Sequence, residues 1–327
     1  MHRSITHSLR WLDSHRALEN LNLRLHRFST RAWTLRIYCV DEAGLEETLA
    51  QLPELLRRRE CQTIKEEKKI SVFRIPLRLG QTIRWVYVKQ HTALTPGYRL
   101  ASICYASAAR RSLCGAFTLL HAGYATARPV AAVEQCHFAL LRTSFYLSEE
   151  IAGAKNITNH WREDLALLKG VDGYRKRRAV LRALARLFQS LHRQGIYHND
   201  LKASNILALD QGPAAASDFS LIDVQGVRKC LYISERRKIK NLAQLNRTLG
   251  KFLSQTEKLV FVKAYMGQRT YDRRKQRRFI HSILEATRRQ IIRERVRHPA
   301  EECEELVGRT SEADGLGKKE AAGAAWR

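Results

Sequence analysis

The sequence has no apolar run long enough to cross a membrane and no cysteine pair with C-x-x-C spacing. A membrane-spanning helix needs roughly 18 or more mainly apolar residues, so any membrane contact should be peripheral. Seven cysteines are an odd number and make a poor disulfide framework, which favours a reducing compartment. Met1 is followed by charged residues rather than by the apolar core of a signal peptide. We therefore expect a cytoplasmic protein.

Proline, glycine and acidic residues are also scarce. Six prolines and 17 glycines among 327 residues, with 44% hydrophobic residues, indicate a folded protein large enough for two lobes. The net charge of +26 predicts attraction to a phosphate-rich partner, which can be nucleic acid, anionic lipid or a phosphorylated glycan. The aromatic residues do not interleave with the basic clusters as base stacking would require. Nucleic acid is therefore a less favoured partner.

Strand-like spacing begins near residue 70. Apolar residues recur over Ile70–Leu77 and again over Ile83–Lys89, on either side of Gly80. This pattern predicts a hairpin with Lys89 on its second strand. A helix over 107–122 and strands over 129–133 and 136–147 are predicted to come after it. The first 60 residues suggest no function.

A long amphipathic helix precedes the most informative segment. Its apolar residues from Val180 to Leu191 share one face, and Gly195 ends it. The string His198-Asn199-Asp200-Leu201-Lys202-Ala203-Ser204-Asn205 comes next, before strands predicted at 206–209 and 219–222 with a turn at 211–213. From about residue 240 to the 290s the chain is helical and very basic, and the end of the chain has a composition typical of disorder.

These residues can supply what phosphoryl transfer needs, which is a positioned nucleophile, a divalent metal and fixed positive charge. Asp200 is the candidate base for an acceptor hydroxyl. Asn205 and Asp223, the residue that ends the second strand, offer the oxygen ligands that Mg²⁺ prefers. Lys202 could neutralise the transferred phosphoryl group, and Lys89 could hold the α and β phosphates.

The alternative for any one of these residues is an ordinary solvated loop position. The complete string is far more specific, because it comes after a helix and precedes a strand and a second strand that ends in Asp223. His198 is expected to be structural, tying this loop to the segment of Asp223.

The chain resembles the lipopolysaccharide kinase family, the heptose and Kdo kinases of the bacterial inner core, from about Val72 to Gly267. The similarity is carried by Val86-Tyr87-Val88-Lys89, the Ala122-Gly123 turn, the string from Tyr197 to Leu207, Leu221-Ile222-Asp223-Val224, and Asn241-Leu242-Ala243-Gln244-Leu245-Asn246. The resemblance implies ATP as donor, Mg²⁺ as metal, a sugar hydroxyl as acceptor, Asp200 as catalytic base, and Asn205 with Asp223 at the metal.

The resemblance also implies an α+β, two-lobed protein-kinase-like fold with a β-rich small lobe and a mainly helical large lobe. We expect an N-terminal extension or start of the small lobe over 1–60, the small lobe over 61–147, the large lobe over 148–300, and a disordered tail over 301–327.

Four features depart from the family's pattern. The 70–89 hairpin has only Gly80 where a glycine-rich loop is usual. The next predicted helix has Arg110, Arg111 and Ser112 where a carboxylate is expected opposite Lys89. Gly226 comes third after Asp223 rather than second, and Asn241 replaces an aspartate.

The acceptor is predicted from the segment after Asp223. No A-P-E sequence occurs there, which disfavours a protein substrate and favours a small molecule or glycan. Basic clusters at 273–275, 277–278 and 288–289 could hold an anionic glycolipid on the inner face of the inner membrane, through contacts that weaken with salt. The alternatives are a kinase of another small molecule, a protein Ser/Thr/Tyr kinase, or a catalytically weak kinase-like protein that binds nucleic acid or acts as a scaffold.

Overall fold

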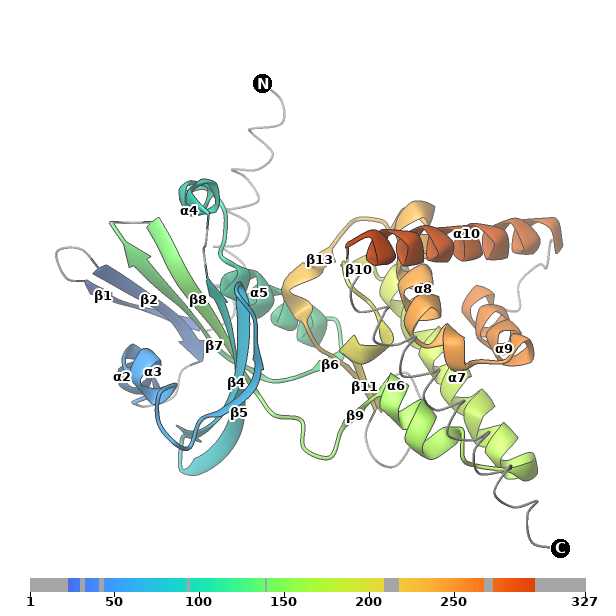
Figure 1. The fold of residues 1–327 in the computed structure, drawn as a ribbon, viewed down its shortest axis with the longest axis horizontal. Coiled ribbons are helices and arrows are strands. Elements are labelled where there is room, and N and C mark those ends of the chain that lie inside the picture. Colours follow the sequence, from blue (N-terminus) through green and yellow to red (C-terminus); the bar gives the residue numbers. More distant parts are fainter. Residues whose placement is uncertain are drawn as a thin grey trace, which may run out of the picture.

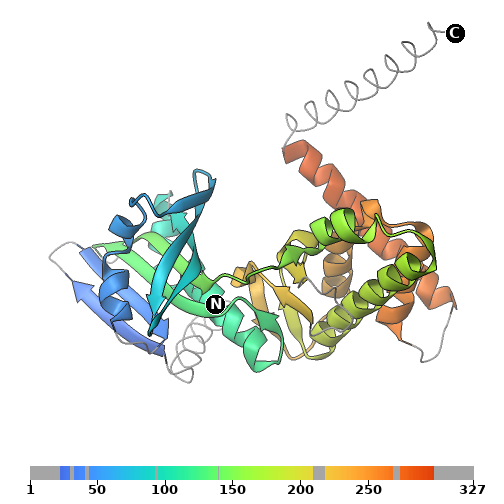
Figure 2. The same cartoon turned by 90° about the horizontal axis from the view of Figure 1, so that it is seen from below.

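The computed structural model describes residues 23–29, 33–40, 44–92, 95–138, 140–208, 218–267 and 273–297. These residues form a β-rich small lobe and a mainly helical large lobe (Figures 1 and 2). The α+β, two-lobed fold class predicted from the sequence is therefore confirmed. The lobe boundaries given above remain a proposal. The turn predicted at 211–213 and the tail over 301–327 lie outside the described residues.

A seven-stranded antiparallel sheet dominates the small lobe, in the order β1-β2-β7-β8-β5-β4-β3. Its strands are β1 (Leu23–Ser29), β2 (Trp33–Val40), β3 (Gln62–Glu66), β4 (Ile70–Leu79), β5 (Thr82–Thr92), β7 (Pro129–His137) and β8 (Leu140–Glu149). Its helices are α2 (Leu45–Ala50), α3 (Leu52–Leu55), α4 (Pro96–Ala101) and α5 (Ala108–His121). The predicted hairpin is present as β4 and β5, paired from Ile70↔His91 to Leu79↔Thr82.

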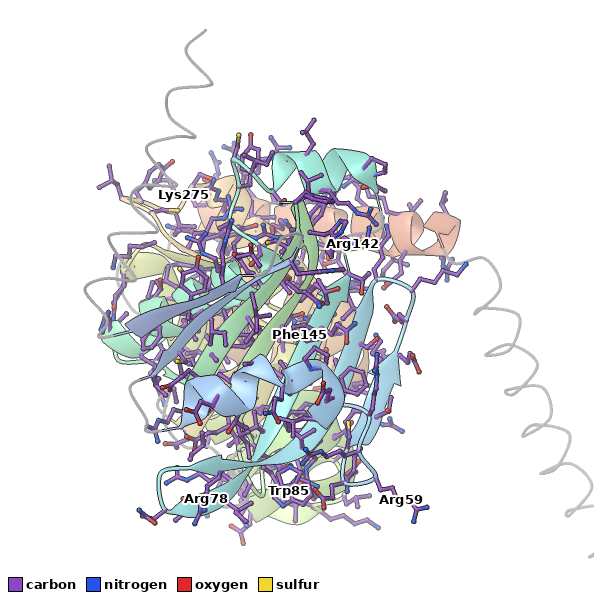
Figure 3. The ribbon with its side chains drawn as sticks, turned by 90° about the vertical axis from the view of Figure 1, so that its left-hand side faces the viewer. Arg59, Arg78, Trp85, Arg142, Phe145 and Lys275 are labelled. Carbon is purple, nitrogen blue, oxygen red and sulfur yellow. The ribbon has the colours of Figure 1, made fainter. Side chains whose placement is uncertain are left out.

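The two faces of the sheet bury different helices. Val86 and Val88 are fully buried in the cluster formed with α2 and α3, and Figure 3 shows Phe145 of β8 behind these two helices. The opposite face carries Tyr38, Ala132 and Tyr146, which pack with α5. Successive side chains of a strand point to opposite faces. Lys89, next to Val88, therefore lies on the face that carries α5.

The large lobe is built on helices and short strands. Its helices are α6 (Ile157–Asn159), α7 (Gly170–Arg193), α8 (Glu235–Thr248), α9 (Gln255–Met266) and α10 (Arg273–Arg297), with a π-helical turn over His160–Leu165. Its strands are β9 (Lys155–Asn156), β10 (Ile196–His198), β11 (Ile206–Ala208), β12 (Phe219–Leu221) and β13 (Val227–Lys229), and β6 (Ala125–Thr126) pairs with β12. In the described ranges no helix has the length and apolar character needed to cross a membrane.

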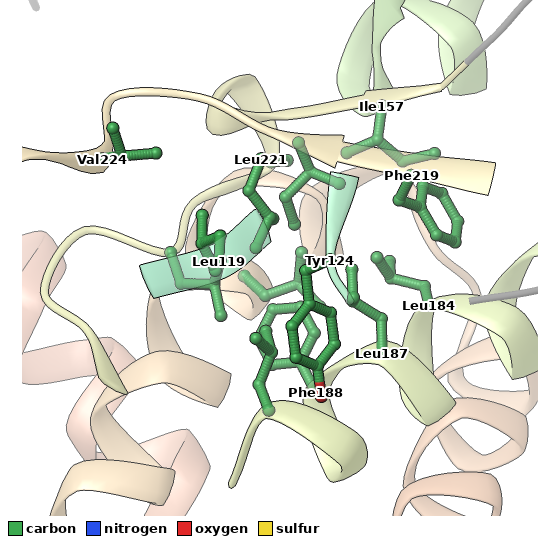
Figure 4. Packing of buried hydrophobic residues seen from close by; sticks show 14 of the residues in the cluster. Leu119, Tyr124, Ile157, Leu184, Leu187, Phe188, Phe219, Leu221 and Val224 are labelled. Atoms are coloured by element: carbon green, nitrogen blue, oxygen red, sulfur yellow. The ribbon is translucent and has the colours of Figure 1, made fainter. Parts of the chain in front are cut away.

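One apolar cluster joins α7, the β11–β12 hairpin and α5. Leu184, Leu187 and Phe188 of α7 point toward Phe219 and Leu221 of β12 (Figure 4). The helix ends as the sequence predicts, because Gly195 has a φ of 72° that favours glycine. Because β10 directly follows this helix, the segment 198–205 lies directly beside this core.

Helix α5 connects the sheet to the segment after Asp223. It begins at an N-cap in which the Ser107 hydroxyl accepts a hydrogen bond from the Arg110 N–H at 3.1 Å. Farther along, a Cβ added to Gly115 would lie 2.1 Å from the Val224 carbonyl oxygen. Only a glycine therefore allows α5 to lie this close to the backbone next to Asp223.

Replacing Gly115 with alanine should separate α5 from that backbone. We expect Gly115→Ala to lower the free energy of unfolding by at least about 1–3 kcal/mol, the usual cost of overpacking. Gly97→Ala is the matched control, because a Cβ there meets nothing within 4 Å and alanine is the better helix former. Denaturant unfolding measures both. Equal stability of the two variants would contradict the close approach.

Candidate active site

The loop from His198 to Asn205 lies between two short strands of different sheets. β10 pairs with β13 and β11 pairs with β12, so both ends of the loop are anchored. Within it, residues 203–205 form a 3-10 turn in which the Asn205 N–H donates to the Lys202 carbonyl oxygen at 3.0 Å. The Ala203 N–H donates to the Thr248 hydroxyl of α8 at 3.0 Å.

His198 ties this loop to the segment of Asp223. Its Nδ1 accepts from the Asp200 N–H at 3.2 Å, so its Nε2 carries the proton that is donated to the Ile222 carbonyl oxygen, also at 3.2 Å. The side chain is almost fully buried, and burial lowers its pKa. A neutral histidine thus fixes the backbone on both sides of the site, which is the structural role expected for it.

The Asp200 carboxylate is partly exposed and has three polar neighbours. Lys202 Nζ lies 3.0 Å from Oδ2, and the Asn205 amide donates to the same oxygen at 3.2 Å. Gln244 Nε2 lies 3.5 Å from Oδ1. The carboxylate is therefore held in one orientation while part of it still faces solvent.

Asn205 and Asp223 lie at the same end of the β11–β12 hairpin. The Asn205 amide nitrogen also donates to the Asp200 carbonyl oxygen at 2.8 Å, which leaves the amide oxygen available. The Ile222 N–H donates to the Asn205 carbonyl oxygen at 3.0 Å, and Asp223 comes next in the left-handed region with a φ of 57°. One amide oxygen and one carboxylate at this position fit the oxygen ligands that Mg²⁺ takes from a protein.

Lys89 reaches the same place from the small lobe. Its Nζ lies 2.6 Å from Asp223 Oδ1. Burial alone would raise the pKa of the Asp223 carboxyl, but the positive charge of Lys89 outweighs burial and holds that pKa below its usual range. Lys89 thus forms its ion pair with Asp223 rather than with a carboxylate on α5.

The arginines of α5 have other contacts. The Arg110 guanidinium lies 4.9 Å from the centre of the Tyr38 ring, and Arg111 donates to the Ala106 carbonyl oxygen at 2.7 Å. His91, two residues beyond Lys89, is neutral, because burial and the charge of Lys89 lower its pKa to about 4.

The structure brings together all five side chains selected from the sequence, namely Lys89, Asp200, Lys202, Asn205 and Asp223. Their catalytic roles remain predictions. Sequence reasoning did not identify Gln244 or Thr248, which hold the loop from α8. Their spacing from Asn241, three and seven residues along a helix, is the one signal that they share a face.

Fold and site together define a protein of the kinase-like fold class, in which the five selected side chains meet where Lys89 of the small lobe pairs with Asp223 of the large lobe. Comparisons with known proteins agree. The profile of the lipopolysaccharide kinase (Kdo/WaaP) family matches residues 112–265. The lipopolysaccharide core heptose(I) kinase WaaP of Pseudomonas aeruginosa is 30% identical over 153 residues, which are 45% of this chain and 55% of that protein. The match thus spans about half the length of this curated relative.

A solved structure of WaaP in complex with acyl carrier protein is similar in fold. It has a TM-score of 0.54 and 24% identity, and the match covers 78% of this chain and 97% of the other. The resemblance to the lipopolysaccharide kinase family is therefore confirmed, and the matched segment contains four of the five selected side chains.

Removing the His198 imidazole should loosen the loop. His198→Leu leaves the Asp200 N–H and the Ile222 carbonyl oxygen without their partner, and each unsatisfied buried group costs about 1–3 kcal/mol. We expect the free energy of unfolding to fall by roughly 2–6 kcal/mol on this basis. His281→Leu, at an exposed position of α10, is the control. Similar losses of stability in both variants would argue against a role of His198 in linking the loop to the segment of Asp223.

Proposed function

We propose that this protein is an ATP-dependent kinase that transfers the γ-phosphoryl group to a sugar hydroxyl, heptose or Kdo, of the lipopolysaccharide inner core. The observation that carries this proposal is the meeting of Lys89 with Asp223 beside Asp200, Lys202 and Asn205. The family match adds the class of acceptor.

Each side chain has a proposed part. Asp200 is held with its carboxylate partly open to solvent, as a base that orients the acceptor hydroxyl and takes its proton. Lys202, at 3.0 Å from that carboxylate, is close enough to neutralise charge on the transferred group. Lys89 would hold the α and β phosphates. Asn205 and Asp223 would hold Mg²⁺, which supplies charge neutralisation across the phosphates.

The course of the chain after Asp223 disfavours a protein acceptor. Only a 3-10 turn and β13 separate Asp223 from α8, which begins at Glu235. This is too short for the segment on which protein kinases place a peptide. The net charge of +26 disfavours a cationic small molecule and suits a densely anionic glycan.

We further propose that the protein works at the cytoplasmic face of the inner membrane. Arg277, Arg278 and Arg288 of α10 are exposed, and an anionic lipid surface attracts such residues. Because the attraction is electrostatic, it should weaken as salt is added. A protein that bound nucleic acid tightly and did not bind ATP would instead fit the scaffold alternative.

The proposed role of Asp200 as base is tested by replacing its carboxylate with the amide of asparagine. With Mg²⁺ and inner-core lipopolysaccharide, the unchanged protein should consume ATP, and Asp200→Asn should reduce the rate at least about a hundredfold because general-base assistance is lost. Lys89→Met should raise KM for ATP, whereas Lys68→Met, exposed in the same lobe, should not. Phosphate transfer to the sugar is measured by mass spectrometry of the lipopolysaccharide. Undiminished transfer by Asp200→Asn would remove Asp200 from the role of base.

The membrane contact is tested by neutralising the three exposed arginines of α10. Since each basic residue near an anionic surface contributes about 1 kcal/mol, the triple change to glutamine should weaken binding to vesicles with anionic lipid roughly a hundredfold. The same change at Arg57, Arg58 and Arg59, which are exposed in the small lobe, is the control of equal charge. Equal losses would assign the attraction to overall charge rather than to α10.

A further inference from the structure

Helix α8 contacts the 198–205 loop through three polar side chains on one face, from Asn241, Gln244 and Thr248. Asn241 is fully buried and Gln244 is nearly so. Asn241 Nδ2 donates to the His198 carbonyl oxygen at 2.7 Å, and Gln244 Nε2 donates to the Asn199 carbonyl oxygen at 2.9 Å. Buried amides must have their hydrogen bonds satisfied, so the orientation of each group can be worked out.

One backbone N–H fixes the orientation of Gln244. The Leu201 N–H lies 3.1 Å from the Gln244 amide and can only donate, so the atom that faces it must be Oε1. The other end of the amide must then be the NH₂ group. That group lies 2.9 Å from the Asn199 carbonyl oxygen and 3.5 Å from Asp200 Oδ1, both of which accept.

The His198 carbonyl oxygen fixes the orientation of Asn241. This oxygen can only accept, so the Asn241 atom that faces it at 2.7 Å must be Nδ2, which also lies 3.1 Å from Gln244 Oε1. Asn241 Oδ1 must therefore accept from His192 Nε2 at 3.2 Å, and His192 Nδ1 accepts from the Tyr265 hydroxyl at 2.8 Å. Burial lowers the pKa of His192 to about 4, which is consistent with this neutral tautomer. The hydrogen bonds from Tyr265 to Asp200 thus share one direction.

We infer that Gln244 is a positioning residue for Asp200, and that Asn241, where the family usually has an aspartate, supports the orientation that the Leu201 N–H sets. This inference rests on the proposed function, in which Asp200 is the base. An aspartate at 241 could donate neither to the His198 carbonyl oxygen nor to Gln244 Oε1. Its carboxylate would instead repel Gln244 Oε1, which the Leu201 N–H holds on that side, and would disturb the position of the amide.

The kinetic test separates positioning from nucleotide binding. Gln244→Met keeps the length of the side chain but cannot hydrogen-bond, and we expect kcat to fall about tenfold, the effect of losing one hydrogen bond to a charged group, with KM for ATP unchanged. Asn241→Asp should lower kcat similarly. Gln290→Met is the matched control, because Gln290 reaches the Lys240 carbonyl oxygen of α8 at 3.5 Å without touching the loop. Unchanged kcat in Gln244→Met would overturn the inference.

A second readout does not need activity or an acceptor. In side-chain amide NMR spectra of the full chain, the Gln244 signal is identified by its loss in Gln244→Met. It should shift on Asp200→Ala and on Asn241→Asp, but not on Asp172→Ala, an exposed residue of α7. A Gln244 signal unmoved by Asp200→Ala would overturn the positioning role. A protein that shows the shifts yet phosphorylates no sugar would contradict the proposed function alone.

Discussion

The ion pair between Lys89 and Asp223 joins a central strand of the small-lobe sheet to the hairpin of the large lobe. Both side chains are largely removed from water, with 23% and 34% of their surfaces exposed. A charge in such a place is costly without a partner. The neighbouring helix α5 cannot supply one to Lys89, because it has arginines where a carboxylate is usual. The two charges therefore depend on each other until another anion and another cation replace them. In the proposed function, a nucleotide at Lys89 and a metal at Asp223 would replace them together.

Local sequence patterns predicted the elements that form the site. The structure reproduces three of these patterns. They are the strand pattern of the hairpin that carries Lys89, the helical spacing of the long helix before the loop, and the strand pattern of the hairpin before Asp223. The loop from His198 to Asn205 is short, so the strands at its two ends determine its path. The site residues could be placed because Lys89 lies within a predicted strand, whereas Asp200, Asn205 and Asp223 lie next to the ends of predicted elements.

Long-range pairing and buried polar contacts could not be predicted in this way. Strands β1 and β2 come from a segment whose basic residues obscure the alternation, and β2 pairs with β7 from Trp33↔His137 to Cys39↔Ala131. Nothing near residue 33 specifies a partner so distant in the chain. Gln244 likewise looks like a surface residue of a basic helix. Its burial depends on the fold of the loop that covers it.

The contacts beneath Asp200 on the α8 side are made by uncharged groups. On the α8 side, Asp200 meets the amide of Gln244 and, behind it, that of Asn241 and the neutral imidazole of His192. A carboxylate at 241 could donate neither to the His198 carbonyl oxygen nor to Gln244 Oε1, and would bring a negative charge against that amide oxygen. With amides in these places, Lys202 is the charged group in direct contact with Asp200. The asparagine that departs from the family's pattern thus supports, through Gln244, the orientation of Asp200, which the proposed transfer of a proton from a sugar hydroxyl requires.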